Sequence, residues 1–226
     1  MLENINPILL LGLPIVLFSL TVHEFAHAIT AYWGGDDTAR LQGRVTLNPI
    51  SHIDPLGTIL LPLMLAMTNN PVLGWARPVP VNVHRLRKPV WNVWVTLAGP
   101  GSNLALALIM ALLVRVFMLL IDNVPVFEEN VNPQQMSAIL TFALLFMMIN
   151  VSLALFNMLP VPPLDGSRVL FHYFIDGKPQ YYPIWENLER YGFIILYMLL
   201  FIPPVRIGLM NVIEFVMKQM MLIAGL

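Results

Sequence analysis

Two histidines and a glutamate stand together in the first apolar stretch of the chain, as His23-Glu24-Phe25-Ala26-His27. On a helix, His23 and His27 lie one turn apart on one face, so both imidazoles can reach a single metal ion. Neutral imidazoles suit Zn²⁺, and Glu24 beside them can accept a proton from a water molecule. The pattern predicts a zinc-dependent hydrolytic site. The other interpretation is a pair of neutral core histidines beside a protonated Glu24.

A zinc site that keeps one position open for water needs a third protein ligand. The remaining candidates are the side chains of His52, Asp54, His84, Asp165 and His172. Asp165 follows segment 160–164, which holds three prolines, so a helix cannot continue there. Non-helical backbone at membrane depth is tolerated where it lines a wet cavity, as an active site would. The residues alone leave open a simple turn at Asp165, or a helix over 166–175 that Asp165 caps.

The composition requires that lipid solvate part of the chain. Hydrophobic residues make up 58% of the 226 residues and charged residues 11%, whereas soluble domains hold about 25% charged residues. The net charge of -1 lacks the basic excess of a nucleic-acid-binding protein, so no nucleic acid is expected as a partner. The absence of cysteine excludes thiol catalysis and a thiolate metal site. We expect a single membrane domain over residues 1–226.

Long apolar runs predict the elements that must position the site. They cover residues 7–33, 56–67, 90–121, 136–159 and 191–226, and Pro203-Pro204 divides the last run into two pieces. The run 56–67 has 12 residues, or about 18 Å of helix, which is short of a hydrocarbon core of about 30 Å. The expected fold is an all-α polytopic membrane protein with about five to six transmembrane or re-entrant helices.

Basic residues indicate the orientation of these runs. Segments 34–55, 68–89 and 160–190 carry arginine or lysine, whereas 122–135 carries neither, so the first three are expected at the cytoplasmic side and the last outside. A run between two cytoplasmic segments cannot cross, which predicts that 56–67 is re-entrant or a short packed helix. A thin crossing that places 68–89 outside is the alternative. With segments 34–55, 68–89 and 160–190 at the cytoplasmic side, the active site is expected to open toward the cytoplasm.

Three motifs in order resemble the site-2 protease family of intramembrane zinc metalloproteases. They are the His23–His27 pattern, Gly99-Pro-Gly-Ser-Asn103 as Gly-x-x-x-Asn, and the stretch from Asn157 to Gly166 that ends in Leu-Asp-Gly. The matching segments extend from about residue 8 to residue 175. The chain is similar to the short prokaryotic subgroup that has neither a PDZ nor a CBS domain. The resemblance implies a multi-pass protein of a prokaryotic plasma or inner membrane.

The resemblance also implies roles for individual residues. His23, His27 and Asp165 would bind one Zn²⁺ per chain, and Glu24 would be the general base. The implied reaction is endopeptidase hydrolysis of membrane-embedded or membrane-adjacent segments of a transmembrane protein or peptide, with the lipid bilayer as surroundings. A membrane metal transporter or sensor and a non-catalytic scaffold are the alternatives.

Three further residues are candidates for contact with the substrate or the transition state. Asn157 and Asn103 are amides in apolar runs that can donate to a developing oxyanion. Hydrogen bonding between helices is the other interpretation, and it is favoured for Asn103. His52 is expected to line the catalytic cavity.

A substrate helix satisfies its own backbone groups, so it must unwind or pair as a strand before it is cut. In segment 74–83, Val79, Val81 and Val83 alternate, which predicts a strand or small β-hairpin at the cytoplasmic face that offers an edge to the substrate. A plain connecting loop is the alternative.

Overall fold

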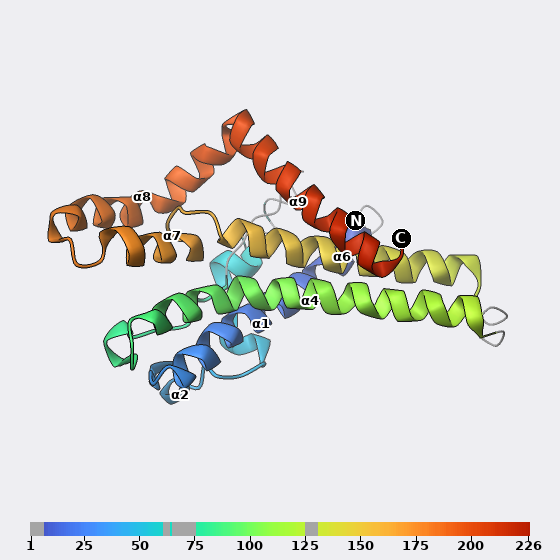
Figure 1. The fold of residues 1–226 in the computed structure, drawn as a ribbon, viewed down its shortest axis with the longest axis horizontal. Helices are drawn as coiled ribbons and strands as arrows, with labels where there is room; N and C mark the ends of the chain where they lie inside the picture. Colours follow the sequence, from blue (N-terminus) through green and yellow to red (C-terminus); the bar gives the residue numbers. More distant parts are fainter. Residues whose placement is uncertain (1–6, 61–63, 65–75, 125–130) are drawn as a thin grey trace.

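A computed structural model describes residues 7–60, 64, 76–124 and 131–226 of the chain. The described residues form helices, with no β-strand among them (Figure 1). The long helices are α1 (Pro7–Trp33), α4 (Val90–Asn123), α6 (Pro133–Asn157), α8 (Tyr182–Phe201) and α9 (Pro203–Ala224). The short α-helices are α2 (Thr38–Leu41) and α7 (Asp165–Leu170). Single 3₁₀ or π turns cover Pro49–His52, Pro55–Leu60, Val83–Arg85, Phe171–Ile175 and Pro179–Tyr181.

Four of the described helices are long and apolar enough to cross a membrane. They are α1 from Leu11 onward, α4, α6 and α9. The 34 residues of α4 extend over about 51 Å, which exceeds the hydrocarbon core. Large apolar side chains such as Phe18 on α1 and Phe215 on α9 are exposed on the outer faces of these helices. Such faces suit contact with lipid, in agreement with the all-helical membrane protein predicted from composition.

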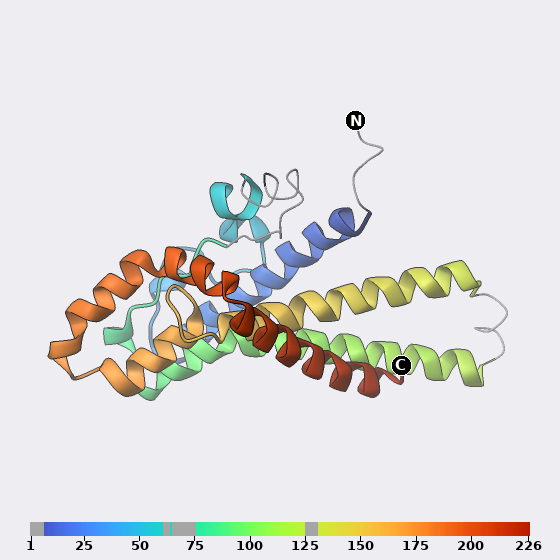
Figure 2. The same cartoon turned by 90° about the horizontal axis from the view of Figure 1, so that it is seen from above.

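The centre of the fold is a pair of antiparallel helices, α4 and α6, which lie side by side (Figures 1 and 2). Helix α1 crosses against both, and α9 lies against both from another side. The shared core consists of Ala111 and Val114 from α4, Ala143 and Met147 from α6, and Ala224 from α9. Small residues allow helix backbones to approach closely, which is how helices gain packing energy in a membrane.

Local sequence signals explain where α6 begins. The Asn132 side chain accepts a hydrogen bond from the backbone N–H of Gln135, and the Gln135 side chain accepts one from the backbone N–H of Asn132. This reciprocal capping box starts the helix at Pro133, earlier than the apolar run at Met136 indicates.

The predicted break in the last apolar run is confirmed. Helix α8 ends at Phe201 and α9 begins at Pro203, because Pro203 and Pro204 both lack the N–H that would continue α8 and both fit the first turn of a new helix. Single prolines, Pro14 and Pro100, lie inside α1 and α4 without ending them. Helix α8 begins at Tyr182, earlier than residue 191. The charged residues Glu186 and Glu189 interrupt its apolar pattern, but they lie on an exposed face.

Two expectations concern the region between α2 and α4. The run 56–67 begins with a π turn at Pro55–Leu60, and most of its remainder lies outside the described residues. The β-hairpin expected over 74–83 is not confirmed: residues 76–82 are irregular and Val83 opens a 3₁₀ turn, while 74 and 75 lie outside the described residues. Pro78 and Pro80 have no N–H to donate to a strand ladder, which is a physical reason for the irregular backbone.

Candidate metal centre

Three buried side chains meet at one point between α1, α4 and α7. The Nε2 atom of His23 lies 3.1 Å from Asp165 Oδ2, and the Nε2 atom of His27 lies 3.3 Å from the same oxygen. The two Nε2 atoms are 3.1 Å apart. The exposed fractions of the three residues are 4% for His23, 7% for His27 and 8% for Asp165. Two nitrogens and one oxygen are thus gathered where a single ion could contact all three.

Different kinds of local structure position these groups. The regular turn of α1 places the two imidazoles edge to face, with ring centroids 4.7 Å apart. Asp165 is the first residue of α7, and its carboxylate points at the two histidines. A Cβ at Gly166 would lie 2.6 Å from the carbonyl oxygen of Leu159, so glycine allows the start of α7 to pack on this backbone.

The hydrogen bonds behind the imidazoles test whether these residues fit a zinc ion. His27 Nδ1 lies 2.6 Å from the backbone oxygen of Val95, and His23 Nδ1 lies 2.7 Å from Asn103 Oδ1. Both partners are acceptors, so each neutral imidazole carries its hydrogen on Nδ1 and presents a lone pair at Nε2. Two lone pairs and a carboxylate oxygen facing one point match the donor set of a catalytic zinc site. The residues present therefore fit Zn²⁺.

Helix α4 approaches the two imidazoles at Gly99. A Cβ at this position would lie 2.6 Å from His23 Nε2 and would also overlap the His27 ring. Such an approach is closer than real Cβ atoms make, so only glycine leaves the nitrogens accessible. By contrast, a Cβ at Gly101 would have no atom within 4 Å.

We therefore expect Gly99→Ala to lower zinc affinity by more than about tenfold, because the methyl group displaces the ligand nitrogens. Gly101→Ala makes the same change two residues away in open space, and we expect it to bind zinc as the wild type does. Zinc affinity of the purified proteins, measured by chelator competition, checks both. Equal affinity of the two variants would contradict this account of Gly99.

Glu24 lies in a cavity of about 630 Å³ beside the three converging groups. Its Oε2 atom accepts a hydrogen bond of 2.8 Å from the backbone N–H of Val79, which lies in the irregular segment 76–82. The cavity is also lined by His23, His27, Val79, Val81, Asn157, Asp165 and Arg168. A carboxylate, the converging ligands and a segment of backbone thus share one space.

Arg44 holds the segment that contacts Glu24. Its Nη2 atom donates a hydrogen bond of 2.6 Å to the backbone oxygen of Arg77. Burial lowers the pKa of Arg44 and repulsion by Arg77 lowers it further, while the attraction of Glu24 opposes both. An arginine pKa starts so far above neutral that the guanidinium stays charged. Arg44 therefore adds a positive charge near Glu24.

The three residues predicted to contact the substrate or the transition state occupy three different positions relative to the cavity. Asn157 lines the cavity, and its Nδ2 donates to the backbone oxygen of Leu153 at 2.9 Å. Asn103 is fully buried behind His23 and bonds to it. His52 is not among the described residues that line the cavity. Its Nε2 lies 2.9 Å from Thr46 O, and its own backbone oxygen accepts from the N–H of Arg77.

Asp54 and His172 lie apart from the described group of His23, His27 and Asp165. Asp54 Oδ1 accepts hydrogen bonds from the backbone N–H groups of Leu56 and Gly57. The Nδ1 atom of His172 lies 3.8 Å from Asp176 Oδ2.

Sequence reasoning missed Asn150, whose amide bonds to Asn103. The signal was present: Asn150 is an amide in an apolar run, two helical turns before Asn157 and so on the same face of the helix.

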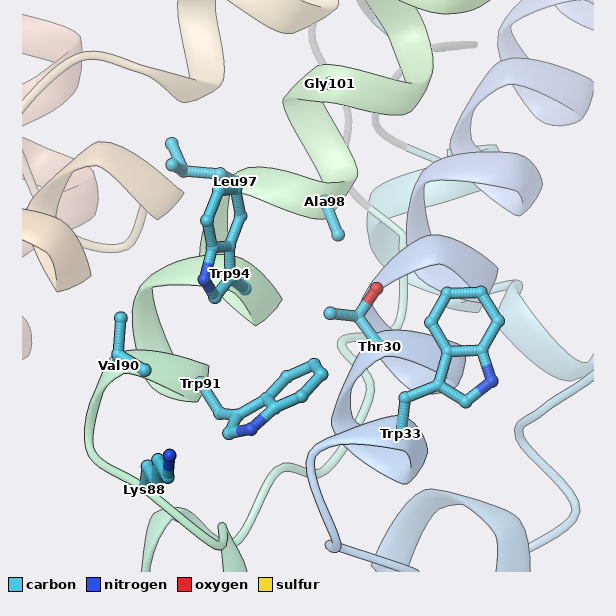
Figure 3. Close-up of a pocket in the computed structure, with 9 residues that line it drawn as sticks. All are labelled: Thr30, Trp33, Lys88, Val90, Trp91, Trp94, Leu97, Ala98 and Gly101. Carbon is cyan, nitrogen blue, oxygen red and sulfur yellow. The ribbon is translucent and has the colours of Figure 1, made fainter.

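A second cavity of about 610 Å³ lies between the end of α1 and the start of α4 (Figure 3). Trp33, Trp91 and Trp94 surround it together with Lys88, and no histidine or carboxylate is among its described lining residues. It therefore offers no metal ligands. Tryptophan and lysine are typical of the boundary between membrane and water, and this composition suits a position at a membrane surface.

Comparison with known proteins shows where similar sequences occur. The family model described as Peptidase family M50 matches residues 11–199. The protein named "Putative zinc metalloprotease YwhC" from Bacillus subtilis is 41% identical over 191 residues, which cover 84% of this chain and 78% of that protein. "Putative zinc metalloprotease Rip2" from Mycolicibacterium smegmatis is 31% identical over 208 residues, covering 89% of this chain and 72% of that protein. No solved structure matches the chain.

Proposed function

The chain belongs to peptidase family M50 and is a zinc metalloprotease, and from this premise we propose that it cleaves peptide bonds within the membrane. One observation carries the proposal: Glu24 shares a cavity with His23, His27 and Asp165, inside a fold whose long helices suit a bilayer. Ionisable groups in a membrane-spanning helix are costly and usually serve a function.

The three converging side chains would hold the zinc ion, and Glu24 would be the general base. When bound, Zn²⁺ supplies a Lewis acid that polarises the carbonyl to be attacked and acidifies a water molecule. Glu24 accepts the proton of the attacking water and returns it to the leaving amide nitrogen. The Val79 N–H donates to Glu24 and so orients its carboxylate within the cavity.

The walls of the cavity suit a segment of a membrane protein. Leu20, Leu153, Phe156, Leu196 and Leu200 supply apolar surface. Pro78, Val79 and Val81 lie on another side, where backbone carbonyls would accept hydrogen bonds from a locally unwound substrate. Asn157 on the wall would donate to the developing oxyanion. Glu24 argues against a transporter or a scaffold, since neither needs a base beside the metal ligands.

Mapping of cleavage sites tests this proposal. The purified chain in lipid vesicles is mixed with a library of synthetic single-span peptides, and the products are identified by mass spectrometry. We expect cuts within or directly beside the apolar span of the substrates. Cuts confined to soluble tails would contradict intramembrane cleavage, and a protein that binds zinc but cuts nothing would favour a transporter or scaffold.

We further propose that the chain is a multi-pass protein of a prokaryotic plasma or inner membrane, with its site open to the cytoplasm. The basic residues of segments 34–55 and 68–89 support this orientation. Because the chain has no cysteine, Arg85→Cys creates a unique label site on an exposed residue. The substitution also removes an exposed ion pair with Asp37, which is worth only about 0–1 kcal/mol.

In intact cells, an impermeant maleimide should leave Cys at position 85 unlabelled until the membrane is opened. A cysteine placed at Asp122, in the segment expected outside, is the matched control and should label at once. Labelling of position 85 from outside would reverse the proposed orientation.

A further inference from the structure

Asn150 is a fully buried amide in the C-terminal third of α6, and the proposed reaction does not use it. An amide in an apolar span is costly unless its donors and acceptor find partners. The partners of Asn150 are one backbone carbonyl and one other amide, that of Asn103 on α4. These contacts connect α6 to the back of the metal centre.

The direction of these hydrogen bonds follows from the backbone. Asn150 Nδ2 lies 3.0 Å from the carbonyl oxygen of Phe146, and a carbonyl can only accept. The nitrogen of Asn150 must therefore face Phe146, and its oxygen must face Asn103. Asn103 Nδ2 donates to that oxygen at 3.0 Å.

Asn103 is oriented in turn. Its Nδ2 also lies 3.3 Å from the backbone oxygen of Ser19, so both hydrogens of this amide have acceptors. Its Oδ1 is left to face His23 Nδ1 at 2.7 Å. Because Oδ1 has no hydrogen to give, the hydrogen between them belongs to His23 Nδ1, and the lone pair of His23 lies at Nε2, which faces Asp165.

His23 and His27 differ in how this state is secured. The acceptor behind His27 is a backbone carbonyl, that of Val95, which cannot exchange places with a donor. The acceptor behind His23 is a side-chain amide, which could rotate by half a turn and present its NH₂ group instead. That rotation would favour the imidazole form with its hydrogen on Nε2, and a protonated Nε2 has no lone pair to offer at the metal position.

We propose that Asn150 is a positioning residue for the metal centre: by accepting from Asn103 at 3.0 Å, beside the longer contact of 3.3 Å to Ser19 O, it opposes rotation of that amide and so keeps the Nε2 lone pair of His23 directed at the metal position. The inference rests on the proposed role of His23 as a zinc ligand. Asn150 itself touches neither metal nor substrate, and its effect passes through Asn103.

A double-mutant cycle on zinc affinity tests the proposal. The full chain is purified in detergent as wild type, Asn150→Leu, Asn103→Leu and the double variant, and zinc is titrated against a chelator. We expect Asn150→Leu to weaken zinc binding about 10- to 100-fold, the range for partners behind metal ligands. In the Asn103→Leu background, Asn150→Leu should have no further effect, since the pathway is already broken.

Two controls separate positioning from simple destabilisation. Thr96→Val removes a buried hydroxyl on α4 that donates to the backbone oxygen of Asn92 in the same helix. This change should leave zinc affinity unchanged. Asn150→Asp keeps an oxygen that can accept from Asn103 and should bind zinc more tightly than Asn150→Leu. If Asn150→Leu does not fold, the comparison of Asn150→Asp and Asn150→Ala replaces it.

Each outcome decides the question. Unchanged affinity in Asn150→Leu, or effects that simply add in the double variant, would overturn the role of Asn150 while the zinc site stands. An equal loss of zinc affinity in Asn150→Leu and Thr96→Val would show that the loss comes from general destabilisation of the fold, and it would overturn the proposal. A wild-type chain that binds no zinc would instead overturn the metal centre itself.

Discussion

Glu24→Gln is expected to lower peptide-bond cleavage by about a thousandfold or more while zinc stays bound. General acid–base catalysis contributes about 10² to 10⁴ in rate, and an amide cannot accept the proton that a carboxylate accepts. The substitution keeps the size of the side chain, and the amide oxygen can still accept from the Val79 N–H. Cleavage of a mapped substrate in vesicles and zinc per chain are the two measurements.

The matched control is Glu186→Gln, which makes the same change on the exposed face of α8. It should cleave as the wild type does. Cleavage by Glu24→Gln at more than about a tenth of the wild-type rate would exclude Glu24 as the general base. A loss of zinc in Glu24→Gln would instead indicate that Glu24 supports the metal centre.

Asp165→Ala is expected to reduce zinc from about one ion per chain to well below that value, with affinity lowered by more than about a hundredfold. Mutation of a residue that only supports a metal ligand already costs about 10- to 100-fold, so removal of a ligand costs more. The carboxylate also supplies a negative charge close to both Nε2 atoms, which neutral histidines cannot replace. Zinc content after dialysis of the purified protein checks this, and no substrate is required.

Asp176→Ala serves as the control, because Asp176 is an exposed carboxylate near His172 and lies apart from the metal centre. It should retain zinc. Full retention of zinc in Asp165→Ala would exclude Asp165 as a ligand and direct attention to His52, whose buried Nδ1 has no partner among the described residues.

Much of the membrane fold could be predicted from local properties of the chain. The apolar runs predicted α1, α4 and α6 to within a few residues, because an apolar segment in lipid must satisfy its backbone groups internally and therefore forms a helix. The break at Pro203 followed from the missing N–H of proline. The start of α8 was missed, since charged residues on an exposed face conceal the helical pattern.

Within the site, the sequence by itself determined the pairing of His23 and His27, because a single helical turn fixes their relative position. Only the tertiary structure brought Asp165 to them across 142 positions of the chain and Asn103 across 80. Likewise, the overlap that requires glycine at Gly99 and the hydrogen bond from Val79 to Glu24 exist only where separate segments pack together. The sequence identifies such groups as costly in an apolar environment. Their partners depend on how the helices cross, which no local pattern contains.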